Sequence, residues 1–200
     1  MAGRRQEEYR FGRILAISDG VFAFSLTLLV VDLVIPTSSS NSALASQLVA
    51  QLPALLSYLI SFAVVALTWN SHRETFGYIR HADGWLIVFN FALLLLVAFL
   101  PFPTAVLGRN QNEPLAAVIY AITLTLINLA AAAIWWYATR GHRLVDRNLD
   151  HHVVKKRFSR LAIGVAVFLV SIPVALWQPY VAEIMWLPLF GVVLFIRTPS

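Results

Sequence analysis

The sequence of 200 residues contains no cysteine and little charge. Without cysteine, a small protein held together by disulfides is excluded. Charged residues make up 12% of the chain, which is half of the roughly 25% found in ordinary soluble domains and excludes a soluble or disordered protein. Nine glycines and nine prolines are too few for a collagen-like chain. Hydrophobic residues make up 59% of the chain and the mean hydropathy is +0.73, so we expect an integral membrane protein.

Long stretches without Asp, Glu, Lys or Arg indicate where the chain crosses the bilayer. A spanning helix needs about 20 mostly apolar residues. The turn-forming residues 36–42 divide the longest such stretch into two. We therefore predict an all-α integral membrane protein with six transmembrane helices. They form a single transmembrane domain over residues 1–200, at about 12–35, 46–70, 84–104, 115–138, 158–178 and 181–197.

The basic residues predict the orientation of these helices. The chain has 15 Lys and Arg against 10 Asp and Glu, and a cytoplasmic N-terminus places every Lys and Arg except Arg109 in a cytoplasmic segment. Such an excess on the cytoplasmic side is typical of membrane proteins. We therefore predict that both termini are cytoplasmic, and we interpret the net charge of +5 as an orientation signal and not as a nucleic-acid surface.

Ionisable residues inside a predicted span mark either function or a paired structural network. Asp19 interrupts the first apolar run, and the second span ends on the same side of the membrane in residues 69–73, Trp-Asn-Ser-His-Arg. We expect a polar network that comprises Arg13, Ser18, Asp19, Trp69, Asn70 and His72. This network either fastens the first helix to the second or forms a proton relay or pH sensor through His72.

Three other polar features allow simpler interpretations. Asp32, near the outer end of the first span, is either an interfacial residue or part of a carboxylate ring at a pore mouth, and Glu183 has the same two interpretations. The basic segment 140–157 is expected to be a solvated loop near anionic headgroups. No metal site is expected from its histidines, which are His142, His151 and His152.

A row of apolar side chains follows another face of the first helix. Phe24, Leu28 and Val31 have the spacing i, i+4, i+7, and Asp19 lies about 140° around the helix from Phe24. Thr27 lies beside the row. From periodicity alone, the row fits a lipid-facing surface, the interior of a helix bundle or the lining of a pore.

Three motifs follow one another on the first three predicted helices. They are Arg13-x3-Ile17-Ser18-Asp19, Trp69-Asn-Ser-His72-Arg73-x2-Phe76, and a segment from Asn90 that ends in Leu100-Pro-Phe-Pro-Thr104. Together they resemble the endosomal/lysosomal potassium channel family, with its Arg-x3-Phe-Ser-Asp signature. The resemblance implies a bacterial homologue with six helices per chain, which assembles in the plasma membrane as a four-fold symmetric homotetramer with the first helix lining a central pore.

The resemblance also implies roles for individual residues. Phe24, Leu28 and Val31 correspond to the pore constriction, and Thr27 corresponds to the hydroxyl residue implicated in potassium preference. Arg13, Ser18, Asp19, Trp69 and His72 correspond to a packing network that supports the first helix. Three positions depart from the family pattern: Ile17 replaces Phe, Arg73 replaces the second His, and Phe24 replaces Ile or Leu at the constriction.

We therefore predict a potassium-preferring, leak-type cation channel with an apolar constriction instead of a filter of backbone carbonyls. It would need no cofactor, and its partners would be monovalent cations such as K⁺, the lipid bilayer and three further copies of the chain. Two alternatives remain open, a proton-permeable channel and a proton-coupled secondary transporter that uses Asp19 and His72. An enzyme is not expected, since no nucleophile, cofactor or metal motif accompanies Asp19 and His72.

Overall fold

The computed structural model describes residues 2–33, 36–38 and 40–186, and their regular elements are helices. In chain order these are α1 (Ala2–Leu28), the 3₁₀ helix η1 (Leu29–Asp32), α2 (Asn41–Ala50), α3 (Leu52–Tyr78), α4 (Gly84–Phe99), α5 (Pro101–Arg109), α6 (Pro114–Thr139), the 3₁₀ helix η2 (Arg140–His142) and α7 (His151–Trp177). Residues 179–186 are also helical.

Five of the described helical segments are long and apolar enough to cross a membrane. They are Phe11–Asp32, Leu52–Tyr78, Gly84–Arg109, Pro114–His142 and His151–Trp177. The all-α membrane architecture predicted from the sequence is confirmed. The sixth predicted span, 181–197, lies mostly outside the described residues.

Two of the predicted spans contain a break that the sequence analysis missed. The span predicted at 46–70 covers the end of α2 and most of α3. The two helices meet at Gln51, and Pro53 lies in the first turn of α3. The span predicted at 84–104 is interrupted at Leu100, after which Pro101 begins α5. Proline has no backbone N–H to donate, so it is tolerated in the first turn of a helix and starts a new one.

Two helices begin well before their predicted starts. α1 extends from Ala2 through the apolar run, and it tightens into η1 before Asp32. α7 begins at His151 and not near residue 158, because the Asp150 carboxylate accepts a hydrogen bond from the backbone N–H of His152 and caps the helix. Lys155, Lys156 and Arg157 are therefore helical.

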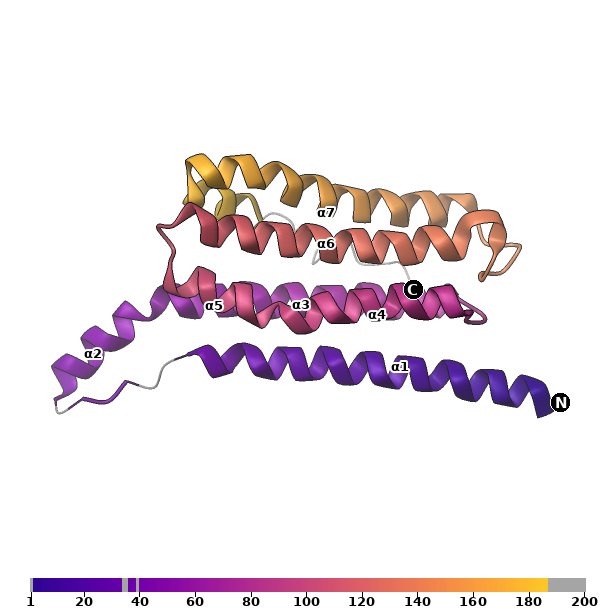
Figure 1. Cartoon of the computed structure of the whole chain (residues 1–200), viewed down its shortest axis with the longest axis horizontal. Coiled ribbons are helices and arrows are strands. Elements are labelled where there is room, and N and C mark those ends of the chain that lie inside the picture. The colour runs from indigo at the N-terminus through magenta and orange to yellow at the C-terminus, as the bar shows by residue number, and fades with distance from the viewer. Residues whose placement is uncertain (1, 34–35, 39, 187–200) are drawn as a thin grey trace.

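The helices lie side by side in a bundle with α6 near its centre (Figure 1). α6 packs along α7 on one side and against α4 and α5 on the other, through buried residues such as Ala117, Tyr120 and Leu124. α1 packs on α3 and α4 at the opposite side of the bundle from α7, and α2 projects from one end (Figure 1). The start of α1 and the connections 79–83 and 143–150 share the other end, which we call the basic end because it carries most of the Lys and Arg.

Candidate permeation face and its polar supports

α1 has one buried face and one exposed face. Four buried residues at i, i+4, i+7 and i+11 face the bundle, and they are Ser18, Phe22, Ser25 and Leu29. On the opposite side, Phe24 is 62% exposed, Val31 is 73% exposed and Thr27 is also exposed. Leu28 is half-buried at the border between the two faces. Of the residues that the family resemblance assigns to a constriction, Phe24 and Val31 are thus left uncovered by the rest of the described chain.

This exposed face also carries polar atoms at membrane depth. The Thr27 hydroxyl donates to the carbonyl oxygen of Phe24 at 2.8 Å, so its oxygen lone pairs remain available on the exposed side. Asp19 is exposed beside this face, within the apolar segment Phe11–Asp32. A carboxylate at this depth is costly in hydrocarbon, so the exposed side of Asp19, about 140° around the helix from Phe24, requires water or another protein surface.

Asp19 and Ser18 are held by different partners. The indole N–H of Trp69 donates to Asp19 Oδ1 at 2.8 Å. Asn90 Nδ2 donates to Ser18 Oγ at 3.0 Å, and Asn90 Oδ1 lies 2.8 Å from His72 Nε2. Because that amide oxygen only accepts, the hydrogen bond requires a hydrogen on His72 Nε2. The contacts join α1 to both α3 and α4.

His72 is enclosed as well as hydrogen-bonded. Its ring is stacked on Phe76 at a centroid distance of 4.3 Å and lies 5.4 Å from the ring of Phe22. Its hydrogen-bond partner, Asn90, was not among the residues that the sequence predicted for the network. The signal was present, since Asn90 is the one amide in the apolar helix α4, and a buried amide in a membrane span needs polar partners.

The remaining predicted site residues lie elsewhere. Arg13 lies over the ring of Tyr9, with 6.0 Å between its guanidinium carbon and the ring centroid. Asn70 donates to Glu74 Oε1 at 2.9 Å and so belongs to a different cluster. Asp32 lies 3.6 Å from Arg109, and both side chains are substantially exposed at the end of the bundle opposite the basic end.

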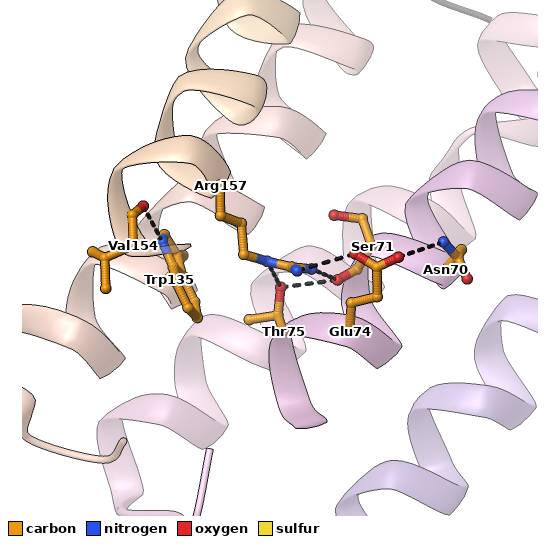
Figure 2. Close-up of polar contacts among 7 residues, drawn as sticks. All are labelled: Asn70, Ser71, Glu74, Thr75, Trp135, Val154 and Arg157. Carbon is orange, nitrogen blue, oxygen red and sulfur yellow. Dashed lines mark hydrogen bonds and ion pairs between the residues drawn. The ribbon is translucent and has the colours of Figure 1, made fainter. Parts of the chain in front are cut away.

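That second cluster is centred on Arg157 of α7 (Figure 2). The Arg157 side chain is only 11% exposed and forms an ion pair with Glu74 at 3.0 Å. It also donates to the Thr75 hydroxyl and to the carbonyl oxygen of Ser71. Its guanidinium carbon lies 5.4 Å from the centroid of Trp135. The prediction of a solvated loop over 140–157 is therefore wrong for Arg157, which reaches from α7 across to α3.

A third polar group joins the ends of α4 and α6. Asp83 caps α4 by accepting from the backbone N–H of Leu86 at 2.9 Å, and it accepts from the Tyr137 hydroxyl at 2.6 Å. Arg143 in turn donates to the Tyr137 hydroxyl at 2.8 Å. Partial burial alone would raise the pKa of Asp83, but these hydrogen bonds and the positive charge of Arg143 outweigh it and hold the pKa below its ordinary value.

The histidines of the basic segment do not converge with carboxylates. The rings of His142 and His151 lie 6.1 Å apart. Within the part of the chain that the structure describes, no three His, Asp or Glu side chains are grouped so that they could hold a metal ion.

Taken together, the fold and these contacts define a helical membrane protein whose first helix is fastened through polar contacts on one face. The other face of that helix, which is mainly apolar and contains one hydroxyl, is not covered by the described chain. In a membrane, such a face contacts lipid, packs on other copies of the chain or forms the wall of a water-filled path.

Comparison with known proteins identifies the family. A family profile described as "Endosomal/lysosomal potassium channel TMEM175" matches residues 13–101. The chain is 34% identical over 157 residues to a potassium channel of Streptomyces collinus, and the match covers 76% of each chain. It also resembles the crystal structure of a lysosomal potassium-selective channel TMEM175 homolog from Chamaesiphon minutus, with a TM-score of 0.83, 28% identity and coverage of 93% of this chain and 97% of the other.

A more distant relative carries a different description. The human endosomal/lysosomal proton channel TMEM175 is 21% identical over 169 residues, which are 82% of this chain and 34% of the human protein. The chain belongs to the TMEM175 family, which confirms the resemblance noted in its motifs. It is accordingly an ion channel and not an enzyme.

Proposed function

We propose that this chain forms a potassium-preferring, leak-type cation channel in a bacterial plasma membrane, with its first helix lining the pore. The observation that carries the proposal is the exposed row of Phe24 and Thr27 on α1 and Val31 on η1, opposite the face that packs on α3 and α4. The relatives from Streptomyces collinus and Chamaesiphon minutus, which are described as potassium channels, support the choice of ion.

A pore requires several copies of the chain. One α1 helix encloses no path, whereas four copies around a symmetry axis close one with the same face of each helix turned inward. The position of Asp19 supports this arrangement, because water or a neighbouring subunit beside α1 would spare its carboxylate from contact with lipid. We propose six spans per chain with the basic end and both termini in the cytoplasm, as the positive-inside rule favours.

The constriction would be apolar. From Phe24 to Val31 the chain rises about 12 Å, at about 1.5 Å per residue in α1 and about 2 Å per residue in η1. Leu28 at the border of the exposed face would contribute between them. Such rings exclude water when narrow and make an ion shed part of its hydration shell. K⁺ and Cs⁺ hold water less tightly than Na⁺ and should pass more easily. The Thr27 oxygen would offer partial replacement for the lost water and strengthen this preference.

The polar contacts of α1 would then have a supporting role. Trp69 holds Asp19, and Asn90 joins Ser18 to His72, so the buried face of α1 is fixed in rotation and height against α3 and α4. A fixed rotation is what keeps Phe24 and Val31 directed to the axis. Asp32, paired with Arg109, would lie at the outer mouth of the pore.

Proton permeation is the second candidate function. It is favoured by the description of the human relative as a proton channel and by the exposed carboxylate of Asp19 within a span. A proton-coupled transporter would use both Asp19 and His72. The burial of His72 between two aromatic rings favours a structural role for that residue.

Reconstitution in liposomes tests the proposal. With a K⁺ gradient and no counter-substrate, we expect sustained flux, a reversal potential that favours K⁺ over Na⁺, and a native mass close to four times the subunit mass of 22.3 kDa. Flux that requires a second solute would overturn the channel, and a reversal potential that follows pH in place of K⁺ would replace K⁺ by protons. A mass of any other multiple would overturn the tetramer.

A further inference from the structure

A pocket of about 300 Å³ lies at the basic end of the bundle, between the start of α4 and the end of α6. Its walls are aromatic and its remaining lining residues are two arginines. The lining residues are Trp85, Phe89, Trp136, Tyr137, Arg140 and Arg143. None of them contributes to the face of α1 proposed for ion permeation.

Both arginines of the pocket lie over aromatic rings at the end of α6. α6 ends at Thr139, and Gly141 adopts φ +64°, a left-handed conformation that glycine accepts without strain. The turn brings Arg143 back to the end of α6, where its guanidinium carbon lies 4.8 Å from the ring centroid of Tyr137. Arg140 follows Trp136 by four residues, and its guanidinium carbon lies 4.9 Å from the ring centroid of Trp136. The pocket therefore combines flat apolar walls with two cations at its rim.

The charge of the pocket is positive after its neighbours are counted. The carboxylate beside the pocket is that of Asp83. It accepts hydrogen bonds from the Leu86 N–H and the Tyr137 hydroxyl, so both of its oxygens are turned toward these groups. In the described ranges, neither Arg140 nor Arg143 is ion-paired. The field of the α4 N-terminus favours an anion and that of the α6 C-terminus opposes one, so the two helix ends largely cancel. Arg143 donates to the same Tyr137 hydroxyl that binds Asp83, so this carboxylate offsets part of its charge. Two guanidiniums against one carboxylate still leave a net positive charge that suits an anion.

The surroundings of the pocket are those of a membrane interface. Trp85 and Trp136 are exposed, as is typical of tryptophans at the level of the lipid headgroups. Further from the basic end, the exposed side chains on these two helices are apolar, with Val88 and Leu95 on α4 and Leu129 on α6. An anion bound at the arginines would thus have hydrocarbon directly beside it on the protein surface.

We propose that this pocket binds an anionic phospholipid. The phosphate would be held by Arg140 and Arg143, and the glycerol and upper acyl chains would lie against Trp85, Phe89 and Trp136. Basic pockets on the cytoplasmic side of membrane helices bind anionic headgroups in this way, and lipid supplies the apolar part that a free phosphate lacks. A bound lipid would bridge α4 and α6 at the end where Asp83 and Tyr137 already join them.

Native mass spectrometry of the delipidated channel, titrated separately with phosphatidylglycerol and phosphatidylcholine, tests the proposal. We expect saturable retention of about one phosphatidylglycerol per subunit and much weaker retention of phosphatidylcholine. In the double variant Arg140→Gln/Arg143→Gln, the apparent affinity for phosphatidylglycerol should fall about tenfold. The wild-type comparison of the two lipids needs no variant, so it stays informative if the double variant does not fold.

Arg147→Gln is the matched control, because Arg147 is exposed in the same segment but does not line the pocket. It should change the affinity by less than about twofold, and an equal loss in this variant would mean unspecific attraction and overturn the site. The proposed site would also be overturned if the wild-type channel retained phosphatidylglycerol and phosphatidylcholine equally, or if it retained neither lipid. Inorganic phosphate that displaces the lipid at similar concentration would assign the site to a free anion instead.

Discussion

At the scale of single residues, Phe24 is the side chain on which the proposed constriction depends most. It is large, apolar and uncovered by its own chain. Replacing it by alanine in every subunit would remove four rings from one level of the pore and lower the cost of wetting it. We expect Phe24→Ala to raise the basal K⁺ flux by at least about twofold in liposomes and to increase the single-channel current in planar bilayers.

Phe91→Ala is the control for this change. Phe91 is also exposed at membrane depth, but it lies on α4 and outside the proposed pore lining. It should leave the current unchanged. If Phe24→Ala behaved like Phe91→Ala, the row on α1 would be a lipid-facing surface and the assignment of the pore would fail.

Thr27 is the residue expected to affect selectivity and not conductance. Its hydroxyl already donates to the Phe24 carbonyl, so what it can offer to an ion is an oxygen lone pair. Thr27→Ala should narrow the permeability difference between K⁺ and Na⁺, seen as a shift of the bi-ionic reversal potential toward zero. Thr27→Ser keeps the oxygen and should keep the selectivity. An unchanged reversal potential in the alanine variant would remove Thr27 from the account.

At the scale of helices, Arg157 is the polar connection between α7 and α3. Most of the packing of α7 is on α6, and the Arg157 side chain reaches past Trp135 to Ser71, Glu74 and Thr75 (Figure 2). Arg157→Met would leave Glu74 without its cation in a partly buried position. We expect a lower melting temperature in detergent, equivalent to a loss of about 2–3 kcal/mol in the free energy of unfolding.

Two further variants separate the ion pair from a general effect of charge. Lys156→Met removes the neighbouring exposed cation of α7 and should be nearly neutral. In the double variant Arg157→Met/Glu74→Gln, the unpaired carboxylate is absent and part of the stability should return. If the losses in Arg157→Met and Glu74→Gln alone added up to the loss in the double variant, the ion pair would contribute nothing, and Arg157 would stabilise through its other contacts.

The contact between α4 and α6 through Asp83 should give a dependence on pH. Because the pKa of Asp83 is lowered in the folded chain, the ionised carboxylate stabilises the fold. That contribution is complete above the ordinary pKa of an aspartate, about 4, and is lost as the pH falls through the lower folded value. The melting temperature of Asp83→Asn should therefore lie below that of the wild type at pH 7. The gap should begin to narrow below about pH 4 and close as the pH falls through the lower folded pKa.

Asp146→Asn provides the comparison, since Asp146 lies exposed in the connection after α6 and bonds only locally, to the N–H of Asn148. Its gap to the wild type should be small at both pH values. A gap for Asp83→Asn that stayed constant down to pH 3 would mean that the charge of Asp83 contributes nothing to the joint between α4 and α6.

Hydropathy and motif spacing predicted much of the architecture. Five apolar segments of the right length are present. Trp69 binds Asp19 directly across α1 and α3, whereas Ser18 and His72 are joined only through Asn90 of α4. What remained hidden depended on neighbours far along the chain. Asn90 joins two residues on other helices, and Arg157 belongs to a segment that reads as a charged loop until Asp150 is seen to cap α7. Pairings between distant helices leave no local pattern in one sequence.

At the scale of the whole molecule, α1 lies at one side of the bundle, although the α1 helices of four copies would together surround the ions. It packs on α3 and α4 through one face, and its other face would meet neighbouring subunits around the axis. Its orientation therefore depends on a few polar contacts, and these contacts should matter for assembly more than for conduction. A substitution at Asp19 distinguishes a role in assembly from a role in conduction.

Asp19→Asn removes the charge while keeping an oxygen that can accept from Trp69. The amide bonds the indole more weakly and adds donors without a defined acceptor, so α1 should be held less firmly. We expect the tetramer fraction in size-exclusion chromatography to fall by roughly half. Asp32→Asn makes the same change in η1, at the end of the bundle opposite the basic end. There the carboxylate forms only a surface ion pair with Arg109, so this variant should assemble normally. A fully assembled Asp19→Asn channel with altered proton flux in pH-jump liposome assays would instead make Asp19 part of a proton path, which is the competing function.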